Sequence, residues 1–519
     1  MKKKTPMRPK RRKAPKRRLL EFVTEPTVAV RYGQSVTDPR DGLTLFGPVD
    51  HGKGNVTSLS LGIIGTPDGI ALCKEWLARI SKPVRNAQPD IARPFFPGFQ
   101  EVFGVPMDPN PAVIPLNPTV LEQLYHFRDG HRRIGELSTH FVDAMENFIA
   151  ENERQVTLWI VMVPDALYQY AKPKSGSAKP SIDSGSMADL DRHLTGFGFD
   201  DEDTKEFARI RDLFNYEKDF HNQLKIRLLS KKLLTQVIRE GTIRIPVGKH
   251  EKVLEKFMLH ETAKAWNLSS AIYYKHGGMP WRLGAIREGV CYIGLTFKQD
   301  ETNTDARHAC CAAQMFLGSG QGMVFRGRPG PYYNADSKEF HLNQVAAEEL
   351  VTKVIESYKR ENDGKAPKQL FIHGQTYFGD EEWSAFVKAA GTTTQVVGVR
   401  IRDELTFKLF RSKKYPVLRG TYYAYGKRKA FLWTRGFIPR IQSVMGLETP
   451  NPLSVEVIRG EESIHTVCSD VMALTKLNYN SCIFGDGKPI TLKFADLVGN
   501  ILTAGPNAEL EVLPFKYYI

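Results

Sequence analysis

Four side chains in the middle of the sequence have the types and the spacing of a phosphate-binding site. His221 and Lys225 stand four residues apart in the segment FHNQLKIRLL, so a helix would carry both on one face. Gln236 follows on the strand-like run TQVIRE, and Lys275 precedes two glycines in YYKHGGMP. Two ammonium groups and a histidine N–H can offset the charge of a terminal phosphate. The competing interpretation of each residue alone is an ordinary solvated helix face.

The elements that must hold these residues are strands alternating with helices. Apolar runs at residues 58–65 and 157–163 predict strands, and helical patterns follow them at residues 69–80 and 164–171. This alternation predicts a parallel sheet covered by helices. Residues 171–188, which are rich in Ser, Gly, Lys and Pro, are expected to form a mobile surface loop.

A second unit is predicted to begin near Gly284. Its expected elements are a strand at 289–297, a hairpin at 314–327, a helix at 343–362, a strand at 369–373, a helix at 380–390 and a strand at 394–402. Together they predict a mixed sheet with covering helices, which is the pattern of an RNase H-like fold. Periodicity alone does not separate this fold from other α/β sheets.

The positive charge of the sequence is concentrated at its beginning. Of the formal net charge of +14, eleven positive charges lie in residues 1–18, so about +3 remains for the other 501 residues. Residues 1–18 contain three prolines and no apolar run, and they are expected to be a disordered tail that holds polyanions loosely. Any nucleic-acid site in the remainder must therefore be a local basic pocket.

Cysteine usage and hydropathy indicate a reducing compartment. The six cysteines, Cys73, Cys291, Cys310, Cys311, Cys468 and Cys482, include no CxxC spacing and are expected to be reduced core thiols. The sequence contains no run of 18 apolar residues. We therefore expect a soluble cytoplasmic protein without a membrane segment.

One glycine-rich stretch imitates a nucleotide-binding loop. GPVDHGKGN matches G-x-x-x-x-G-K with Gly47, Gly52 and Lys53, but Gly54 stands where such a loop needs Ser or Thr to ligate magnesium. A strand-like run follows in place of a helix. The stretch therefore favours a turn, and a nucleotide-dependent switch that uses Lys53 is a minor alternative.

The pattern H-x-x-x-K, then Q, then K-x-G-G, formed by the four residues above, resembles the MID domain pocket of Argonaute proteins. The resemblance implies that His221, Lys225, Gln236 and Lys275 grip the 5′-phosphate of a guide strand. Lys264 is a rival for the last position, but no glycines follow it. In many prokaryotic Argonautes the final carboxylate and the pocket glutamine also coordinate a metal ion. By that resemblance, Gln236 and Ile519 would hold Mg²⁺ beside the guide phosphate. Plain core packing is the alternative for the apolar ending LPFKYYI.

The second half resembles the PIWI domains of short prokaryotic Argonautes in segments such as PVLRGTYY, FLWTRGFIPR and ITLKFADLVGNILTAGP. The resemblance implies a basic tail at residues 1–18, a Rossmann-like MID domain at 19–282 and an RNase H-like PIWI domain at 283–519. It leaves no room for the N-terminal and PAZ domains of long Argonautes.

An active PIWI domain cuts with a tetrad of acidic residues that hold two metal ions. By resemblance, one aspartate would stand at Thr296 and another at about Gly374, where no carboxylate exists. The nearby acids are Asp300, Glu301 and Asp305, which follow the first strand, and Asp380, Glu381 and Glu382, which are placed to cap a helix. We therefore expect a nuclease fold that grips nucleic acid without cutting it.

The function implied by the resemblance is that of a recognition subunit. It would bind a guide RNA, detect complementary single-stranded DNA of an invader, and activate a partner in which an APAZ domain is fused to a TIR, sirtuin-like or nuclease effector. The implied setting is prokaryotic immunity by abortive infection, with possible oligomerisation of the complex on activation. The alternative is an active, guide-directed, metal-dependent nuclease that uses displaced acids. The effector, the polarity and first base of the guide, the oligomeric state and the role of the tail stay open.

Overall fold

The computed structural model describes most of the 519-residue chain, namely residues 20–52, 56–86, 90–171, 219–244, 251–284, 287–299, 309–316, 322–326, 332–334, 339–412, 414–447, 449–505 and 513–519. Several predictions fall outside them: the basic tail, all but the first residue of the loop predicted at 171–188, Lys53 and Gly54, and the acids Asp300, Glu301 and Asp305.

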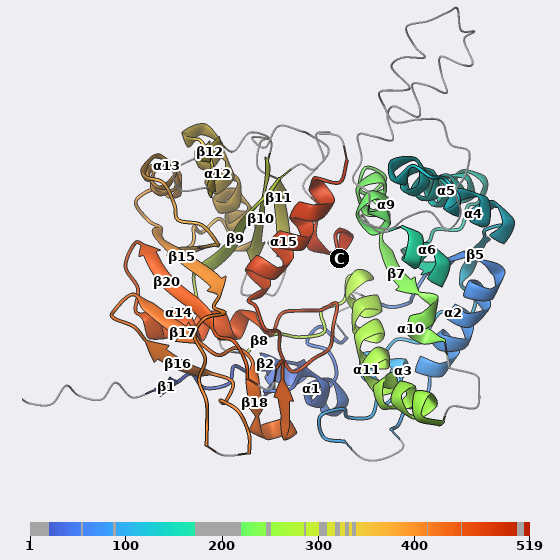
Figure 1. The fold of residues 1–519 in the computed structure, drawn as a ribbon, viewed down its shortest axis with the longest axis horizontal. Coiled ribbons are helices and arrows are strands. Elements are labelled where there is room, and N and C mark those ends of the chain that lie inside the picture. Colours follow the sequence, from blue (N-terminus) through green and yellow to red (C-terminus); the bar gives the residue numbers. More distant parts are fainter. Residues whose placement is uncertain are drawn as a thin grey trace, which may run out of the picture.

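A four-stranded parallel sheet forms the centre of the N-terminal half (Figure 1). Its strands, in spatial order, are β5 (Ala112–Pro115), β4 (Leu61–Gly65), β6 (Leu158–Val163) and β7 (Thr235–Arg239). Every residue of β4 and β6 is buried, as expected of strands covered on both faces. The predicted parallel sheet and its alternation with helices are confirmed.

Helices pack on both faces of this sheet. They are α2 (Pro67–Ile80), α3 (Phe99–Phe103), α4 (Pro118–Tyr125), α5 (Gly130–Glu151), α6 (Asp165–Tyr170), α9 (Phe220–Leu229), α10 (Glu240–Ile243) and α11 (Glu251–Lys275). Alternate strand residues enter different hydrophobic clusters: Ile63 packs in the cluster that contains α2, and Ile64 in the one that contains α5. The Asp219 side chain caps α9 by accepting from the N–H of Asn222 at 3.0 Å, which fixes where this helix begins.

A nine-stranded mixed sheet forms the second half. Its spatial order is β1 (Glu21–Phe22), β16 (Thr421–Ala424), β17 (Lys429–Leu432), β20 (Leu453–Arg459), β15 (Gln395–Asp403), β14 (Gln369–Gly374), β9 (Val290–Gln299), β10 (Ala309–Phe316) and β11 (Gly322–Arg326). The strands β9, β14 and β15 run parallel, and all other neighbours are antiparallel. The predicted mixed sheet and the β10–β11 hairpin are confirmed.

Four helices cover the two faces of the mixed sheet. They are α12 (Gln344–Glu361), α13 (Asp380–Ala390), α14 (Ile464–Leu474) and α15 (Ile490–Leu502). Alternation along β9 shows which helices share a face: Ile293 packs in the cluster of α12 and α13, whereas Tyr292 packs in the cluster of α14 and α15. The helix α15 lies so close to β9 that a Cβ atom at Gly294 would meet the carbonyl oxygen of Thr491 at 2.0 Å.

Smaller elements complete the fold. They are β2 (Val28–Ala29), β3 (Ser35–Val36), β8 (Arg282–Leu283), β12 (Tyr332–Asn334), β13 (Glu339–His341), β18 (Gly436–Ile438), β19 (Ser443–Met445), α1 (Pro39–Leu45) and the 3-10 turns η1 (Arg31–Gly33), η2 (Pro439–Ile441) and η3 (Phe515–Tyr517). The strand β8 spans the sequence boundary expected after residue 282, and it pairs with β2. The earlier strand β1 joins the mixed sheet, so the first described residues contribute to the second half.

The described part of the stretch that imitates a nucleotide-binding loop, residues 47–52, forms a turn after α1. Gly47 and Gly52 adopt positive φ angles, and residues 56–60 lead into β4 without a helix. Asp50 accepts hydrogen bonds from the Tyr273 hydroxyl at 2.8 Å and the Met279 N–H at 2.7 Å. The turn therefore fastens the region around the end of α11 and has a structural role.

The described cysteines agree with the expected reduced state. Cys73, Cys291, Cys468 and Cys482 are buried free thiols. None of the helices in the described part of the chain combines the length and the apolar character that crossing a bilayer requires.

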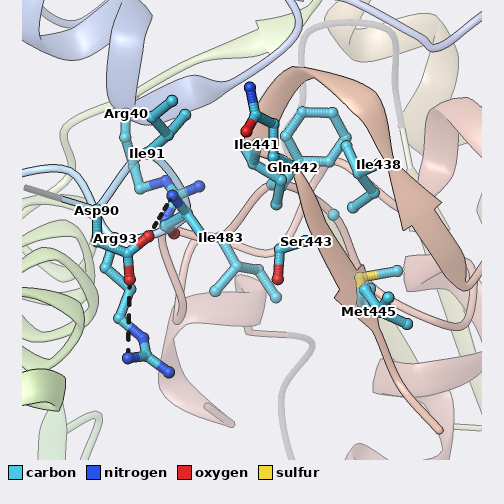
Figure 2. Close-up of a pocket in the computed structure, with 14 residues that line it drawn as sticks. Arg40, Asp90, Ile91, Arg93, Ile438, Ile441, Gln442, Ser443, Met445 and Ile483 are labelled. Atoms are coloured by element: carbon cyan, nitrogen blue, oxygen red, sulfur yellow. Dashed lines mark hydrogen bonds and ion pairs between the residues drawn. The ribbon is translucent and has the colours of Figure 1, made fainter. Parts of the chain in front are cut away.

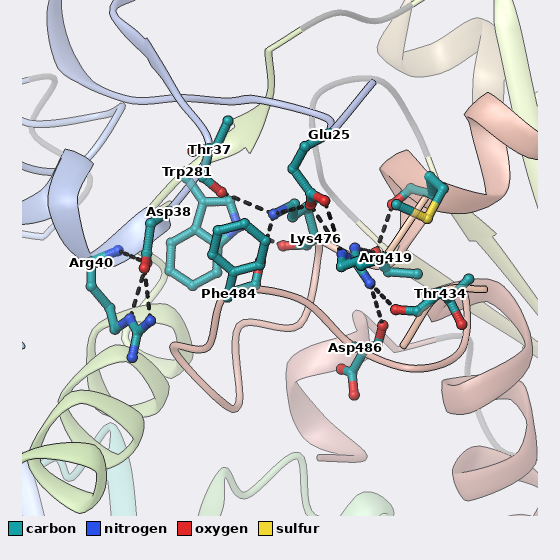
Figure 3. A network of polar contacts seen from close by, with 12 residues as sticks. Glu25, Thr37, Asp38, Arg40, Trp281, Arg419, Thr434, Lys476, Phe484 and Asp486 are labelled. Atoms are coloured by element: carbon teal, nitrogen blue, oxygen red, sulfur yellow. Dashed lines mark hydrogen bonds and ion pairs between the residues drawn. The ribbon is translucent and has the colours of Figure 1, made fainter. Parts of the chain in front are cut away.

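A buried ionic network fastens the N-terminal segment to the second half (Figure 3). Glu25 accepts from Nε of Arg419 at 3.1 Å and from Nζ of Lys476 at 2.6 Å. Arg419 also donates to the Thr475 hydroxyl at 2.5 Å and to the carbonyl oxygen of Thr434. Because both cations are 2% exposed, their loss would leave Glu25 poorly compensated in a low-dielectric environment.

Replacing Arg419 with Met is expected to lower the free energy of unfolding by about 3 kcal/mol, because it removes one partner of a buried ion pair. The matched control is Arg440→Met, since the Arg440–Asp41 pair is partly exposed and should contribute less than about 1 kcal/mol. Urea and thermal unfolding of the two variants provide the measurement. Equal losses in both would contradict the assigned role of the network.

Candidate nucleic-acid interface

The predicted phosphate-binding residues come from three neighbouring elements. His221 and Lys225 lie on α9, Gln236 lies on β7, and Lys275 is the last residue of α11. Lys225 is 2% exposed and Lys275 is 0% exposed, whereas Gln236 is half-buried and His221 is exposed. The structure therefore brings the two lysines and the glutamine together inside the protein and leaves His221 at the rim.

The two lysines meet at one carbonyl oxygen. Nζ of Lys225 and Nζ of Lys275 each donate to the carbonyl oxygen of Thr235 at 2.9 Å. Lys225 makes a second bond, to the main-chain oxygen of Ile519 at 2.7 Å, and Lys275 makes a second bond, to Oε1 of Gln236 at 2.7 Å. Two segments distant in sequence, β7 and residue 519, thus supply the acceptors.

The ammonium groups are buried, and no acidic side chain in the described part of the chain compensates them. Neither lysine forms an ion pair or hydrogen bond with an Asp or Glu side chain of the described residues. Burial lowers the pKa of Lys225 to about 7, although its bond to Ile519 favours the charged form. Burial and then the Lys225 charge lower the pKa of Lys275 well below its usual value. Two adjacent buried lysines of this kind make a candidate anion-binding site, because a bound anion would favour their protonated forms and offset both their desolvation and their mutual repulsion.

His221 is placed to act at the edge of this site. Its Nδ1 lies 3.3 Å from Oδ1 of Asn222. Surrounding protein atoms and then the Lys225 charge lower the pKa of His221, and its solvent exposure moderates this shift. A neutral imidazole at the rim donates a hydrogen bond without adding to the buried positive charge.

A further lysine lies beside the glycine turn that follows α11. Nζ of Lys516, on η3, is 3.9 Å from the position of a Cβ atom at Gly277. Burial lowers the pKa of His276, and the Lys516 charge lowers it further by a smaller amount. No pattern in the sequence indicates Lys516, because only the folded chain places η3 next to α11. The rival residue Lys264 lies eleven residues before Lys275 on α11, which is about 16 Å along the helix axis.

The oxygens proposed to hold a metal ion are both found at the lysine pair. Oε1 of Gln236 and the main-chain oxygen of Ile519 are hard ligands of the type that Mg²⁺ prefers. Each already accepts from an ammonium group at 2.7 Å, so a divalent cation would be repelled unless an anion binds with it. These residues fit Mg²⁺ only together with phosphate oxygens. No cluster of three or more His, Cys, Asp or Glu side chains suited to a metal occurs in the described ranges.

The two positions expected to lack catalytic carboxylates are neighbours in the mixed sheet. Gly374 ends β14 and pairs with Leu295, the residue before Thr296 on the parallel strand β9. Thr296 is 4% exposed, and its hydroxyl has no hydrogen-bond partner in the described part of the chain. A Cβ atom at Gly374 would approach the Phe378 ring at 3.0 Å. Neutral groups therefore occupy both positions.

A buried histidine separates these positions from α15. His373 is fully buried, and its Nδ1 lies 2.9 Å from the hydroxyl of Thr491. Burial lowers the pKa of His373 to about 3, so the ring is neutral at physiological pH. Sequence reasoning did not identify Thr491, because no local pattern indicates that α15 packs on this part of the sheet.

The acids near this centre have structural partners. Asp496 on α15 pairs with Lys298 on β9 at 2.7 Å. Asp380 pairs with Arg459, and the buried carboxylate of Glu382 accepts from the N–H groups of Leu342 at 3.0 Å and Gly379 at 3.3 Å. Asp380, Glu381 and Glu382 lie in the first turn of α13, where carboxylates stabilise a helix. The helix-capping role expected for these acids agrees with this placement.

Comparison with known proteins shows which solved structures have a similar fold. No family model and no curated protein matches the sequence. Among solved structures, Clostridium butyricum Argonaute bound to a guide DNA and a 19-mer target DNA superposes with a TM-score of 0.61 and 14% identity, covering 96% of this chain and 55% of that one. A. aeolicus Argonaute superposes with a TM-score of 0.51 and 16% identity, and the match covers 95% of this chain and 54% of that one. Aa-Ago with externally bound siRNA superposes with a TM-score of 0.52 and 15% identity, and the match covers 96% of this chain and 56% of that one. The chain therefore has an Argonaute-like α/β fold and spans about half the length of these proteins, and the predicted fold class is confirmed.

Sulfate is expected to raise the thermal unfolding temperature of the wild-type chain more than chloride at equal ionic strength, because it compensates the two lysines. As pH rises through about 7, Lys225 without a bound anion loses its proton. The extra rise in unfolding temperature caused by sulfate should therefore become smaller between about pH 6 and pH 8.5. The variant Lys275→Met should lose this extra rise in unfolding temperature, whereas the exposed control Lys231→Met should keep it. An increment of the same size in Lys275→Met would contradict the anion site.

Proposed function

We propose that this chain binds a guide strand through its 5′-terminal phosphate at the buried lysine pair. One observation carries the proposal: Lys225 and Lys275 share the carbonyl oxygen of Thr235, are almost fully buried, and have no Asp or Glu side chain as a partner among the described residues. A terminal phosphate carries about −1.5 to −2 charges near neutral pH, which matches two cations. An internal phosphodiester carries a single charge, so the pocket favours the end of a strand.

The likeness to Argonaute structures supports nucleic acid as the ligand. The Clostridium butyricum protein was solved with both a guide and a target strand. For this chain we propose a guide RNA and a complementary single-stranded DNA target. Base pairing would supply the sequence specificity, and the protein would contact the backbones.

We further propose that Mg²⁺ binds with the guide phosphate. Oε1 of Gln236 and the main-chain oxygen of Ile519 would hold the ion, and phosphate oxygens would complete its ligands. The bound ion would add positive charge at the guide end. Lys225 and Lys275 would orient the phosphate by fixed hydrogen bonds, and His221 would donate a further bond from the rim.

The second half is proposed to grip the paired strands without cutting them. Two metal ions at a scissile phosphate need carboxylates, because negative charge must offset their mutual repulsion. Thr296 and Gly374 provide none, and His373 is buried and neutral. The alternative, an active metal-dependent nuclease, would have to recruit other acids; Asp380 and Asp496 are already paired with Arg459 and Lys298.

A chain that recognises a target without cutting it needs a partner to act. We propose an APAZ-domain partner that carries a TIR, sirtuin-like or nuclease effector, activated when target DNA pairs with the guide, in prokaryotic immunity by abortive infection. Co-purification of the chain with its partner, followed by an effector assay with guide and target, tests this part.

The variant Lys225→Ala, alone or with His221→Ala, is expected to weaken loading of 5′-phosphorylated guides by about 10- to 100-fold, since a charge-assisted hydrogen bond contributes about 1.5 to 3 kcal/mol. Binding of 5′-hydroxyl guides should change little, and removal of Mg²⁺ by EDTA should weaken only the phosphorylated guide. Filter binding with guides of the same sequence, with and without the 5′-phosphate, measures the two affinities. Equal losses for the two guide types would assign these residues a structural role only.

With a guide, a fully complementary target and Mg²⁺ or Mn²⁺, the purified chain is expected to bind the target and leave it intact. The variant Thr296→Asp should remain inactive, because one buried carboxylate does not position two metal ions. Denaturing gels of end-labelled target provide the measurement. Guide-dependent cuts at one target position that disappear in Asp380→Asn or Asp496→Asn would instead establish the nuclease alternative.

A further inference from the structure

A hollow of about 540 Å³ lies between the β15–β16 loop and the β18–β19 hairpin, away from the residues assigned above. The residues used below line it from both sides: Phe410, Arg411, Lys414 and Tyr415 from the loop, and Val444 and Gly446 from the hairpin and its end. The loop has the sequence FKLFRSKKY, in which aromatic and basic residues alternate.

The aromatic side chains of this hollow are held in position and face solvent. Phe407 anchors the loop by packing on Phe431, with ring centroids 4.7 Å apart. Tyr415 stacks on Phe437 at 4.0 Å with an interplanar angle of 12°. Phe410, between these two anchors, is 77% exposed. An exposed ring between two packed aromatic residues offers a flat platform for another flat group.

The two cations of the hollow, Arg411 and Lys414, have no acidic partner among the described residues. Arg411 donates from Nη1 to the carbonyl oxygen of Pro416 at 3.1 Å, and Nζ of Lys414 lies 5.5 Å from the Tyr415 ring centroid. Glu448, near the hairpin in sequence, lies outside the part of the chain that the structure describes. Because an arginine fork and an ammonium group remain available beside exposed rings, the hollow suits an anionic ligand with aromatic groups.

The hollow on the other side of the same hairpin has a different character. Figure 2 shows it, with Asp90 and Arg93 on one side and Ser443 and Met445 on the other. Here Arg93 lies 3.8 Å from Asp90, and Arg40 pairs with Asp38 at 2.7 Å. Its cations are already compensated, so it offers no comparable attraction for an anion.

We propose that the hollow at Phe410 binds single-stranded nucleic acid, with an unpaired base stacked on Phe410 and neighbouring phosphates held by Arg411 and Lys414. Exposed aromatic rings interleaved with cations are the combination by which proteins hold single strands without reading their sequence. The inference rests on the proposed function in one respect, that nucleic acid is the ligand. It adds a second binding surface, independent of the 5′ end, for an unpaired part of the guide or target.

The test uses the full chain and 3′-labelled, 5′-hydroxyl single strands of about 20 nucleotides, so that the lysine pair contributes little. In fluorescence anisotropy, Phe410→Ala is expected to bind about tenfold more weakly, and Phe410→Leu equally so, because stacking needs a π face. The variant Phe410→Trp keeps a π face and should bind with wild-type affinity. The control Tyr425→Ala removes an exposed aromatic ring outside the hollow and should bind normally.

The charged side chains of the hollow have a separate signature. The double variant Arg411→Ala with Lys414→Ala should reduce the slope of log affinity against log salt by about 0.7 for each phosphate that the variant no longer neutralises. The control Lys359→Ala with Arg360→Ala, matched in charge at the end of α12, should leave the slope unchanged. Wild-type affinity in Phe410→Ala or in Phe410→Leu, or an unchanged slope in the double variant, would overturn the proposal and indicate an apolar surface for a protein partner.

Failure of this inference and failure of the proposed function give different results. If the hollow is not a nucleic-acid site, Lys225→Ala still loses its preference for 5′-phosphorylated guides while all Phe410 variants bind normally. If the 5′-phosphate pocket is wrong, Lys225→Ala binds 5′-phosphorylated and 5′-hydroxyl guides with equal losses of affinity, while the Phe410 variants still bind 5′-hydroxyl strands more weakly than the wild-type chain.

Discussion

The burial of two ammonium groups at one carbonyl oxygen is the constraint on which the site depends. Lys225 and Lys275 both donate to Thr235, and holding two like charges out of water is unfavourable unless an anion joins them. The fold maintains this arrangement by fixing each contributor separately. Asp219 sets the start of α9, the buried Thr235 begins the edge strand β7 of the parallel sheet, and Lys275 ends α11. Much of the first half therefore serves to hold a pair of charges that repel each other.

The second half has neutral groups at its corresponding positions, in contrast to the buried lysines of the first half. Its sheet pairs Gly374 with Leu295, next to Thr296, so the two positions are close in the sheet but face opposite sides of it; the groups there are neutral, and the described carboxylates nearby are held by arginine, lysine and main-chain N–H groups. In the proposed function the two lysines of the first half bind a strand end, and Thr296 and Gly374 of the second half supply no carboxylate for a metal ion. Both features are in keeping with the proposal that the chain binds nucleic acid without cutting it.

The sequence predicted local features well and distant ones poorly. The four-residue spacing of His221 and Lys225, the glycines after Lys275 and the apolar runs of both sheets depend on neighbours along the chain, so periodicity identified them. The pairing of β1 with β16, the approach of Lys516 to Gly277 and the placement of Thr491 against His373 join segments far apart in sequence. No local pattern encodes such long-range packing. The uneven burial of His221 and Lys225, which share a helix face, likewise follows from tertiary packing alone.

The bond between Lys225 and Ile519 has a consequence for synthesis. The two residues are 294 positions apart, so at roughly 5 to 20 residues per second the ribosome makes the lysine about 15 to 60 seconds before its acceptor. During that interval the parallel sheet and its helices can already fold, while Lys225 lacks one of its two acceptors. A truncated product of the same gene would contain every lysine of the site and still present it incompletely assembled. The lysine pair would then bind a strand end fully only after translation has reached residue 519.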